Sequence, residues 1–126
     1  MARRYVVQTG EPVLREKCAE VKNFNYEISA LLDDMKETVR AEHGAGLAAP
    51  QIGLAIRAVV IDVDEGYYEM LNPVIISVKG EQTGAEGCLS VKGKQGTVTR
   101  PYKVKAEYRD RYGKKHKLTA EGFFAR

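Results

Sequence analysis

The chain has 126 residues, of which 44% are hydrophobic and 29% are charged, and its formal net charge is +3. This length suits one domain with a buried core and is too short for two, so we expect a single domain over residues 1–126. No apolar run approaches the roughly 20 residues of a membrane span, and the basic start is followed by only two valines instead of a signal-peptide core. We therefore expect a cytoplasmic protein without a membrane partner.

The N-terminal third of the chain predicts an arm and a helix. Residues 1–22 are expected to be extended, with a short helical turn at 12–17. Asn25 is a suitable N-cap, and Glu27 places a negative charge in the first helical turn. Apolar residues then recur at spacings of three and four, which indicates one buried helical stripe: Ile28, Leu31, Leu32, Met35 and Val39. The helix should end near Glu42, just before Gly44.

The stretch from Gly44 to Gly53 reads Gly-Ala-Gly-Leu-Ala-Ala-Pro-Gln-Ile-Gly. Its glycines and its proline do not suit a helix interior, and Gly44 and Gly46 allow another backbone to approach closely. Gln51 is the only side chain in the stretch that can both donate and accept hydrogen bonds. We expect a loop that borders a groove and directs the Gln51 amide into it.

The rest of the chain predicts strands and turns. The expected strands are 57–63, 67–71, 74–78, 81–88, 97–99, 104–108 and 115–118. Asn72-Pro73 should separate the strand at 67–71 from the strand at 74–78. Val91–Gly96 should be a loop, and residues 111–114 should be the turn of a hairpin. The expected fold class is α+β, mostly antiparallel β-sheet with an N-terminal helix.

The two cysteines differ in their surroundings. Cys18 follows Lys17 in a charged segment, and we interpret it as structural. Cys88 lies in the segment Glu86-Gly87-Cys88-Leu89-Ser90, directly after a glycine, which favours a role other than a structural one. Since the expected compartment is reducing, both thiols should be free of a disulfide.

The two segments Gly44–Gly53 and Glu86–Ser90, taken together and in this order, resemble the first two signature motifs of the peptide deformylase family. Every specified position of both motifs is matched, and the resemblance extends to the segment Glu11–Arg15 and to the last residue. The third signature of that family, His-Glu-x-x-His on a central helix, is absent from this sequence. We therefore expect the N-terminal portion of a deformylase-like domain, truncated at its C-terminus, without that helix.

The resemblance implies an activity. Peptide deformylases hydrolytically remove the formyl group from the N-formylmethionine of nascent polypeptides, so formylated nascent peptides are the implied partners. Their metal, usually Fe(II) with Zn, Ni or Co as possible substitutes, is held by one cysteine and two histidines. A metal of this kind lowers the pKa of its bound water, and a glutamate between the histidines acts as base and acid.

The resemblance also assigns roles to residues of this chain. Cys88 would be the metal thiolate, and the Leu89 N–H and the Gln51 side-chain amide would donate to the formyl oxygen. The expected substrate-binding residues are Gly44, Ala45, Gly46 and Gly87. Glu86 should pair with Arg100 and support the site structurally.

Three parts of the implied catalytic machinery are missing: two histidines and the glutamate. His43, at a helix end, and His116, in a charged hairpin, are not expected to replace the ligands, and one cysteine cannot hold a metal in a defined geometry. We therefore expect this chain alone to be inactive and not to retain the metal. Lys92 stands where the family often has proline, which is a small departure beside the substrate loop.

Two alternatives remain open. The chain could be a catalytically dead deformylase-like module that binds peptides, or a basic α+β domain that binds nucleic acid. The second rests on a dense run of basic residues, namely Lys103, Lys105, Arg109, Arg111, Lys114, Lys115 and Lys117. This 103–117 run is either a solvated hairpin face or an electrostatic contact with the ribosome; it carries no indication of specific DNA binding.

Overall fold

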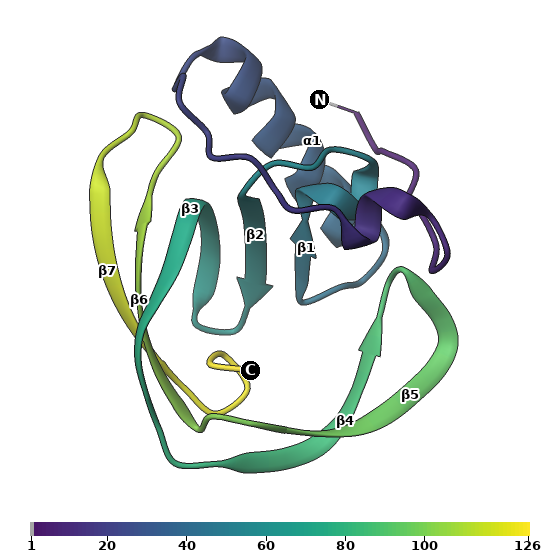
Figure 1. The fold of residues 1–126 in the computed structure, drawn as a ribbon, viewed down its shortest axis with the longest axis vertical. Helices are drawn as coiled ribbons and strands as arrows, with labels where there is room; N and C mark the ends of the chain where they lie inside the picture. Colours follow the sequence, from purple (N-terminus) through teal and green to yellow (C-terminus); the bar gives the residue numbers. More distant parts are fainter. Residues whose placement is uncertain (1) are drawn as a thin grey trace.

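The computed structural model describes residues 2–126 and confirms the α+β class, mostly antiparallel sheet with one long helix in the N-terminal half (Figure 1). The predicted arm can be compared only from Ala2 onward, since Met1 lies outside the described residues. From there the arm is extended, apart from a 3₁₀ turn at Pro12–Arg15. This turn matches the expected one.

Helix α1 (Tyr26–Ala41) begins as predicted: the Asn25 side chain accepts a hydrogen bond from the Ile28 N–H at 3.2 Å. The expected stripe is buried at Leu31, Leu32, Met35 and Val39 and partly buried at Ile28. The helix end differs in detail, because His43, with a φ of 56°, adopts the left-handed conformation ahead of Gly44. The N–H groups of His43 and Gly44 bond to the carbonyls of Arg40 and Val39, the pattern of a Schellman motif.

Five strands form the main antiparallel sheet, in the order β1-β2-β3-β6-β7. Their bounds are β1 Gly46–Ala48, β2 Ala58–Val63, β3 Gly66–Lys79, β6 Lys103–Arg109 and β7 Lys115–Glu121. Strand β2 and the β6–β7 hairpin lie where the sequence predicted them. The Gly44–Gly53 stretch is more regular than the expected loop, since β1 is followed by a 3₁₀ turn (Ala49–Ile52) that ends at Gly53 with a φ of 93°.

The predicted interruption at Asn72-Pro73 is wrong. Strand β3 continues through it with a shift of register between Leu71 and Val74. Asn72 has a φ of 53°, and its side chain binds both the N–H and the carbonyl of Val21, at 2.8 and 2.9 Å. The dipeptide therefore forms a bulge that attaches the N-terminal arm to the sheet.

Strands β4 (Gln82–Cys88) and β5 (Val91–Arg100) form a separate two-stranded antiparallel sheet. The predicted loop at Val91–Gly96 is wrong, because these residues belong to β5. Val91, Gln95 and Gly96 pair with β4, and the register shifts between the Gly87–Gln95 and Cys88–Val91 pairs. Pairing with a complete neighbouring strand supplies the backbone bonds that local propensity does not predict. Figure 1 shows this hairpin extending away from the main sheet, with its turn beside the N-terminal arm.

The core lies between α1 and the first strands of the main sheet. Its fully buried side chains include Leu32, Met35 and Val39 of the helix and Val60 and Leu71 of the sheet. Burial of such a side chain contributes about 1.5–3 kcal/mol. This packing fixes the end of α1 against β1, and so fixes the position of the glycine-rich stretch.

Candidate active site

An open groove of about 840 Å³ lies between the glycine-rich stretch and the β4–β5 turn. Seven of the predicted site residues line it: Gly44, Ala45, Gly46, Gln51, Gly87, Cys88 and Leu89. The remaining lining residues are His43, Val91, Lys92, Gly93, Lys94 and Gln95. The structure therefore brings together two motifs that are about 40 residues apart in the sequence.

The Gln51 side chain connects the two sides of the groove. Its Oε1 accepts the N–H of Ala48 at 2.9 Å, which fixes the amide orientation within its own 3₁₀ turn. Its Nε2 donates to Ser90 Oγ at 3.2 Å and lies 3.6 Å from Cys88 Sγ. The amide donor is therefore directed at the Cys88–Ser90 segment, and Ser90 is buried.

Gly44 and Leu89 are in close contact at one end of the groove. A β-carbon on Gly44 would lie 2.8 Å from Leu89 Cδ1 and 3.2 Å from Val39 Cγ2. The contact joins the end of α1 to the β4–β5 turn, and a side chain at position 44 would displace Leu89. Strand β1, which follows, is an edge strand of the main sheet and pairs with β2 alone.

Cys88 is an exposed free thiol. Within residues 2–126 no group of three or more His, Cys, Asp or Glu side chains is close enough together to hold a metal ion. His43 lines the groove, whereas His116 lies 2.7 Å from Asp110 and stacks on Tyr108. The described residues thus supply one thiolate ligand and do not by themselves fit the metal that the resemblance implies.

Glu86 and Arg100 form the predicted type of pair. The Arg100 guanidinium donates two hydrogen bonds to the Glu86 carboxylate, at 3.0 and 3.1 Å. These bonds hold the pKa of Glu86 below its ordinary value and raise the pKa of Arg100. The pair links the neighbouring strands β4 and β5, and its Glu86 lies two residues before Cys88.

The sequence did not indicate a role for Arg126 in this region. Its side chain is only 10% exposed, and its Nε lies 2.7 Å from Glu86 Oε2. Its Nη2 donates to the carbonyls of Gly84 and Val98 at 2.9 and 2.7 Å. The residue connects the end of the described chain to both strands of the hairpin, through contacts that no local pattern predicts.

No role was predicted for Gln8 or Ser90. Gln8 donates to the Leu89 carbonyl at 3.0 Å, and the Thr9 N–H donates to the Ser90 carbonyl at 2.7 Å. Ser90 could have been found, since it belongs to the second motif. Gln8 has no local signal, because its partner is 81 residues away.

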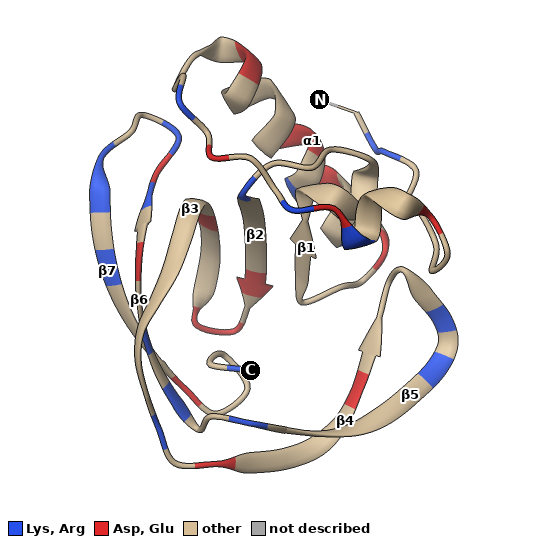
Figure 2. Cartoon of the chain, viewed as in Figure 1, with Lys and Arg blue, Asp and Glu red and all other residues tan. Residues whose placement is uncertain are grey.

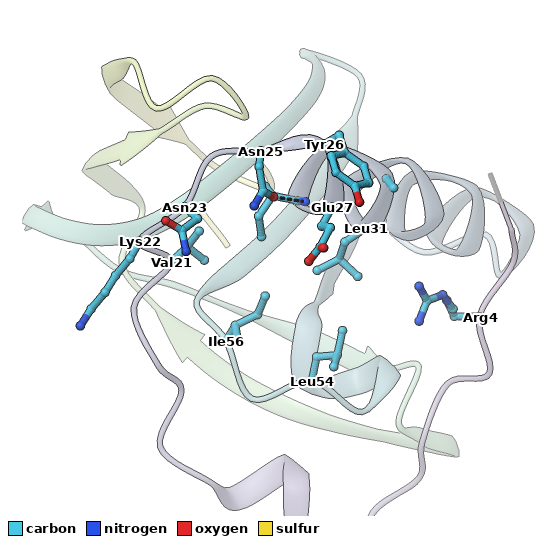
Figure 3. Close-up of a pocket in the computed structure, with 12 residues that line it drawn as sticks. Arg4, Val21, Lys22, Asn23, Asn25, Tyr26, Glu27, Leu31, Leu54 and Ile56 are labelled. Atoms are coloured by element: carbon cyan, nitrogen blue, oxygen red, sulfur yellow. Dashed lines mark hydrogen bonds between the residues drawn. The ribbon is translucent and has the colours of Figure 1, made fainter.

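Two other hollows differ in their relation to the groove. One of about 380 Å³ shares Ala45, Gly46 and Gly87 with it and is otherwise lined by Ile61, Val63, Ala85, Glu86, Phe123, Phe124 and Arg126. The other, of about 530 Å³, lies at the start of α1, against Leu54 and Ile56 (Figure 3). The second contains none of the predicted site residues, and its one drawn hydrogen bond is the Asn25 cap.

The basic 103–117 run lies mostly on one face of the β6–β7 hairpin. Alternate residues of the two strands carry the charges, and Figure 2 shows them along β6 and β7. Lys103 and Lys115 pair with Glu121 and Glu107, while Lys105 and Lys117 are exposed. Arg111 does not belong to this face, since it binds Glu69 and Asp33. No helix within residues 2–126 has the length and apolarity to cross a membrane.

Comparison with known proteins agrees with the fold and the motifs. The family model for polypeptide deformylase matches residues 3–126. The peptide deformylase of Thermoanaerobacter pseudethanolicus is 50% identical over 126 residues, which are 100% of this chain and 79% of that protein. The sequence of this chain is thus similar to that of a known class of hydrolases.

Solved structures give the same result. A peptide deformylase from Legionella pneumophila superposes with a TM-score of 0.95 at 38% identity, covering 98% of this chain and 75% of that one. The enzyme from Thermotoga maritima superposes with a TM-score of 0.96 at 30% identity, covering 99% and 86% of the two chains. The chain belongs to the polypeptide deformylase family.

Proposed function

We propose that this protein takes part in the hydrolytic removal of the formyl group from N-formylmethionine of nascent polypeptides, in the cytoplasm. The observation that carries the proposal is the Gln51 side chain, whose amide nitrogen lies 3.6 Å from Cys88 Sγ at the groove between the two motifs. A preorganised hydrogen-bond donor at this place would stabilise the oxyanion that forms when an amide is hydrolysed.

In this proposal the groove binds the formylated end of the peptide. Gly46, Gly87 and the small Ala45 leave room for an extended peptide along edge strand β1, which can accept a further strand. Gly44 binds the same peptide through its backbone and lets Leu89 pack against the end of α1. The Gln51 amide and the Leu89 N–H donate to the formyl oxygen. Glu86 and Arg100 keep β4 and β5 aligned ahead of Cys88 and do not touch the substrate.

The 126-residue chain by itself lacks the ligands that a catalytic metal needs. Fe(II), or Zn, Ni or Co in its place, needs two or more further ligands beside Cys88, and the described residues do not supply them. We therefore propose that this chain alone binds the peptide but does not retain the metal and does not hydrolyse the formamide. The missing imidazoles and carboxylate would have to come from outside residues 2–126.

The test uses the 126-residue chain and the peptide N-formyl-Met-Ala-Ser, with formate release and peptide binding measured separately. We expect binding in the high-micromolar range or weaker and no formate release above the blank. Gln51→Met should weaken binding about tenfold, through loss of a donor worth about 1.4 kcal/mol. Formate release that disappears in Cys88→Ser would overturn the inactive state, and absence of binding would overturn the groove assignment.

The second candidate function is a peptide-binding module without catalysis, favoured by the intact groove and the single candidate ligand. The intact mass of the protein from its natural source separates the two. A mass above 14.0 kDa, with His-Glu-x-x-His in the added sequence, supports the enzyme. A natural mass of 14.0 kDa supports the binding module.

We further propose that the β6–β7 face contacts ribosomal RNA. The support is the shared face of Lys103, Lys105, Arg109, Lys115 and Lys117. Among the described residues of β6 and β7, Glu107 and Glu121 are the acidic residues on this face. Affinity for ribosomes should fall as salt rises, because each phosphate contact releases counterions. The double variant Lys105→Gln with Lys117→Gln should reduce the slope by about 2, and an unchanged slope would contradict the contact.

A further inference from the structure

The N-terminal arm crosses both motifs at the groove. The Val7 N–H donates to the Gln51 carbonyl at 2.8 Å, and the Thr9 N–H donates to the Ser90 carbonyl at 2.7 Å. In Figure 1 this arm passes beside the turn that joins β4 to β5. The arm therefore supplies backbone bonds to the two segments that face each other across the groove.

Between these two bonds, the half-buried Gln8 extends its carboxamide to the turn itself. Its Nε2 donates to the Leu89 carbonyl at 3.0 Å and to the Val6 carbonyl at 3.2 Å. Its Oε1 accepts the Lys92 N–H at the longer distance of 3.4 Å. One side chain thus binds the arm, the carbonyl of Leu89 and the start of β5.

The turn needs such support, because β4 and β5 pair only with each other among the described strands. The main sheet therefore provides no ladder bonds that would fix Leu89 relative to Gln51. The N–H and the carbonyl of Leu89 belong to successive peptide planes, which rotate about the same α-carbon. Holding the carbonyl in place restricts the direction in which the Leu89 N–H can point.

We propose that Gln8 is a positioning residue that sets the orientation of the Leu89 peptide groups at the groove. Its importance for catalysis rests on the function proposed above, in which the Leu89 N–H binds the formyl oxygen. Gln8 acts through the backbone of Leu89 and does not itself touch the substrate. The inference about the turn concerns this chain alone and needs no metal.

The test is amide hydrogen exchange and ¹H–¹⁵N NMR on the full 126-residue chain, with Gln8→Met as the variant. Methionine keeps the length of the side chain and removes its hydrogen bonds. We expect the Thr9 amide to exchange about tenfold faster, because loss of the Leu89 bond loosens the turn that carries its acceptor. The Leu89 amide and the Gln51 side-chain NH₂ resonances should shift, while exchange in α1 stays unchanged.

Two further variants complete the test. Asn23→Leu is the matched control: it removes an exposed amide of the same N-terminal segment whose side chain makes no hydrogen bond within residues 2–126, and it should leave Thr9 and Leu89 unchanged. Gln8→Glu keeps the shape and loses the donor, so it should reproduce the Gln8→Met result. If Gln8→Met does not fold, Gln8→Glu decides the question.

Unchanged Thr9 exchange and an unmoved Leu89 resonance in the folded Gln8 variants would overturn the inference. Binding of N-formyl-Met-Ala-Ser gives a separate readout. If the wild-type chain binds the peptide, Gln8→Met should weaken binding about tenfold, and equal affinity would also overturn the inference. If the wild-type chain does not bind the peptide at all, the proposed function fails, and the NMR measurements still decide the role of Gln8.

Discussion

Gly44 lies where helix α1, the glycine-rich stretch and the β4–β5 turn meet. Its N–H completes the end of α1 through the Val39 carbonyl at 2.9 Å. The space where its side chain would lie is filled by the side chains of Leu89 and Val39. One position therefore ends a helix and also contacts the candidate site.

For Gly44→Ala we expect a loss of about 1–3 kcal/mol in the free energy of unfolding, because the added carbon overlaps Leu89 Cδ1. Leu89 must move aside, so peptide binding should weaken as well. Gly96→Ala is the control, since a β-carbon there meets nothing within 4 Å. Chemical denaturation compares the two variants, and equal stability would show that the turn adapts freely.

The Glu86–Arg100 pair predicts how stability depends on pH. The Arg100 hydrogen bonds lower the pKa of Glu86 in the folded protein below the unfolded value of about 4.3. A lowered folded pKa gives stability that is complete above about pH 4.3 and is lost as the pH falls through the folded value.

Glu86→Gln should therefore be less stable than the wild type at pH 7, and the difference should shrink below about pH 4. Urea denaturation at several pH values measures the difference. Glu11→Gln, at an exposed residue for which the described structure shows no ion pair, should give no such trend. A difference that grows toward low pH would contradict the assigned direction.

At the scale of elements, the β4–β5 hairpin depends on side chains at both its ends. Gln8 binds its turn, and Arg126 binds its two strands. Gln82, at the start of β4, donates from its Nε2 to the Gly122 carbonyl at 2.6 Å. The hairpin carries Cys88 but shares no ladder with the main sheet. Its position therefore rests on a few specific hydrogen bonds.

Arg126→Met should cost about 1–3 kcal/mol, because the carbonyls of Gly84 and Val98 lose their donors in a nearly buried place. Exchange of the β4 and β5 amides should increase more than exchange of the α1 amides. Arg15→Met, at an exposed residue of the N-terminal turn, serves as the control. A uniform change across the molecule would argue against a local role.

Local patterns predicted the elements whose bonds are local. The α1 stripe and the Asn25 cap need only residues three or four positions apart, and both were predicted. Val91–Gly96 was mistaken for a loop because its strand state depends on pairing with β4. The motif residues could be found by resemblance, but Gln8 and Arg126 could not, since their partners lie 81 and 42 residues away.

At the scale of the whole molecule, one part of β3 exposes consecutive apolar residues. Val74, Ile75, Ile76 and Val78 are 61, 66, 46 and 56% exposed. Exposed apolar side chains concentrated on one strand bind hydrophobic dyes and promote association.

The 126-residue chain should therefore enhance the fluorescence of a hydrophobic dye, and the double variant Ile75→Lys with Val78→Lys should reduce the enhancement by about half. Leu54, which is 38% exposed, lies on a different surface. The variant Leu54→Lys should therefore reduce the dye fluorescence less. A folded chain that does not bind the dye would contradict this prediction.

The distance along the chain between the arm and the β4–β5 turn also predicts an order of folding. Gln8 and Leu89 are 81 positions apart, whereas α1 forms through contacts within a single turn. Closing so long a loop costs chain entropy before any contact compensates for it, and long-range contacts form slowly. During refolding, α1 amides should thus gain protection before the Thr9 amide, and the groove should be completed after the core.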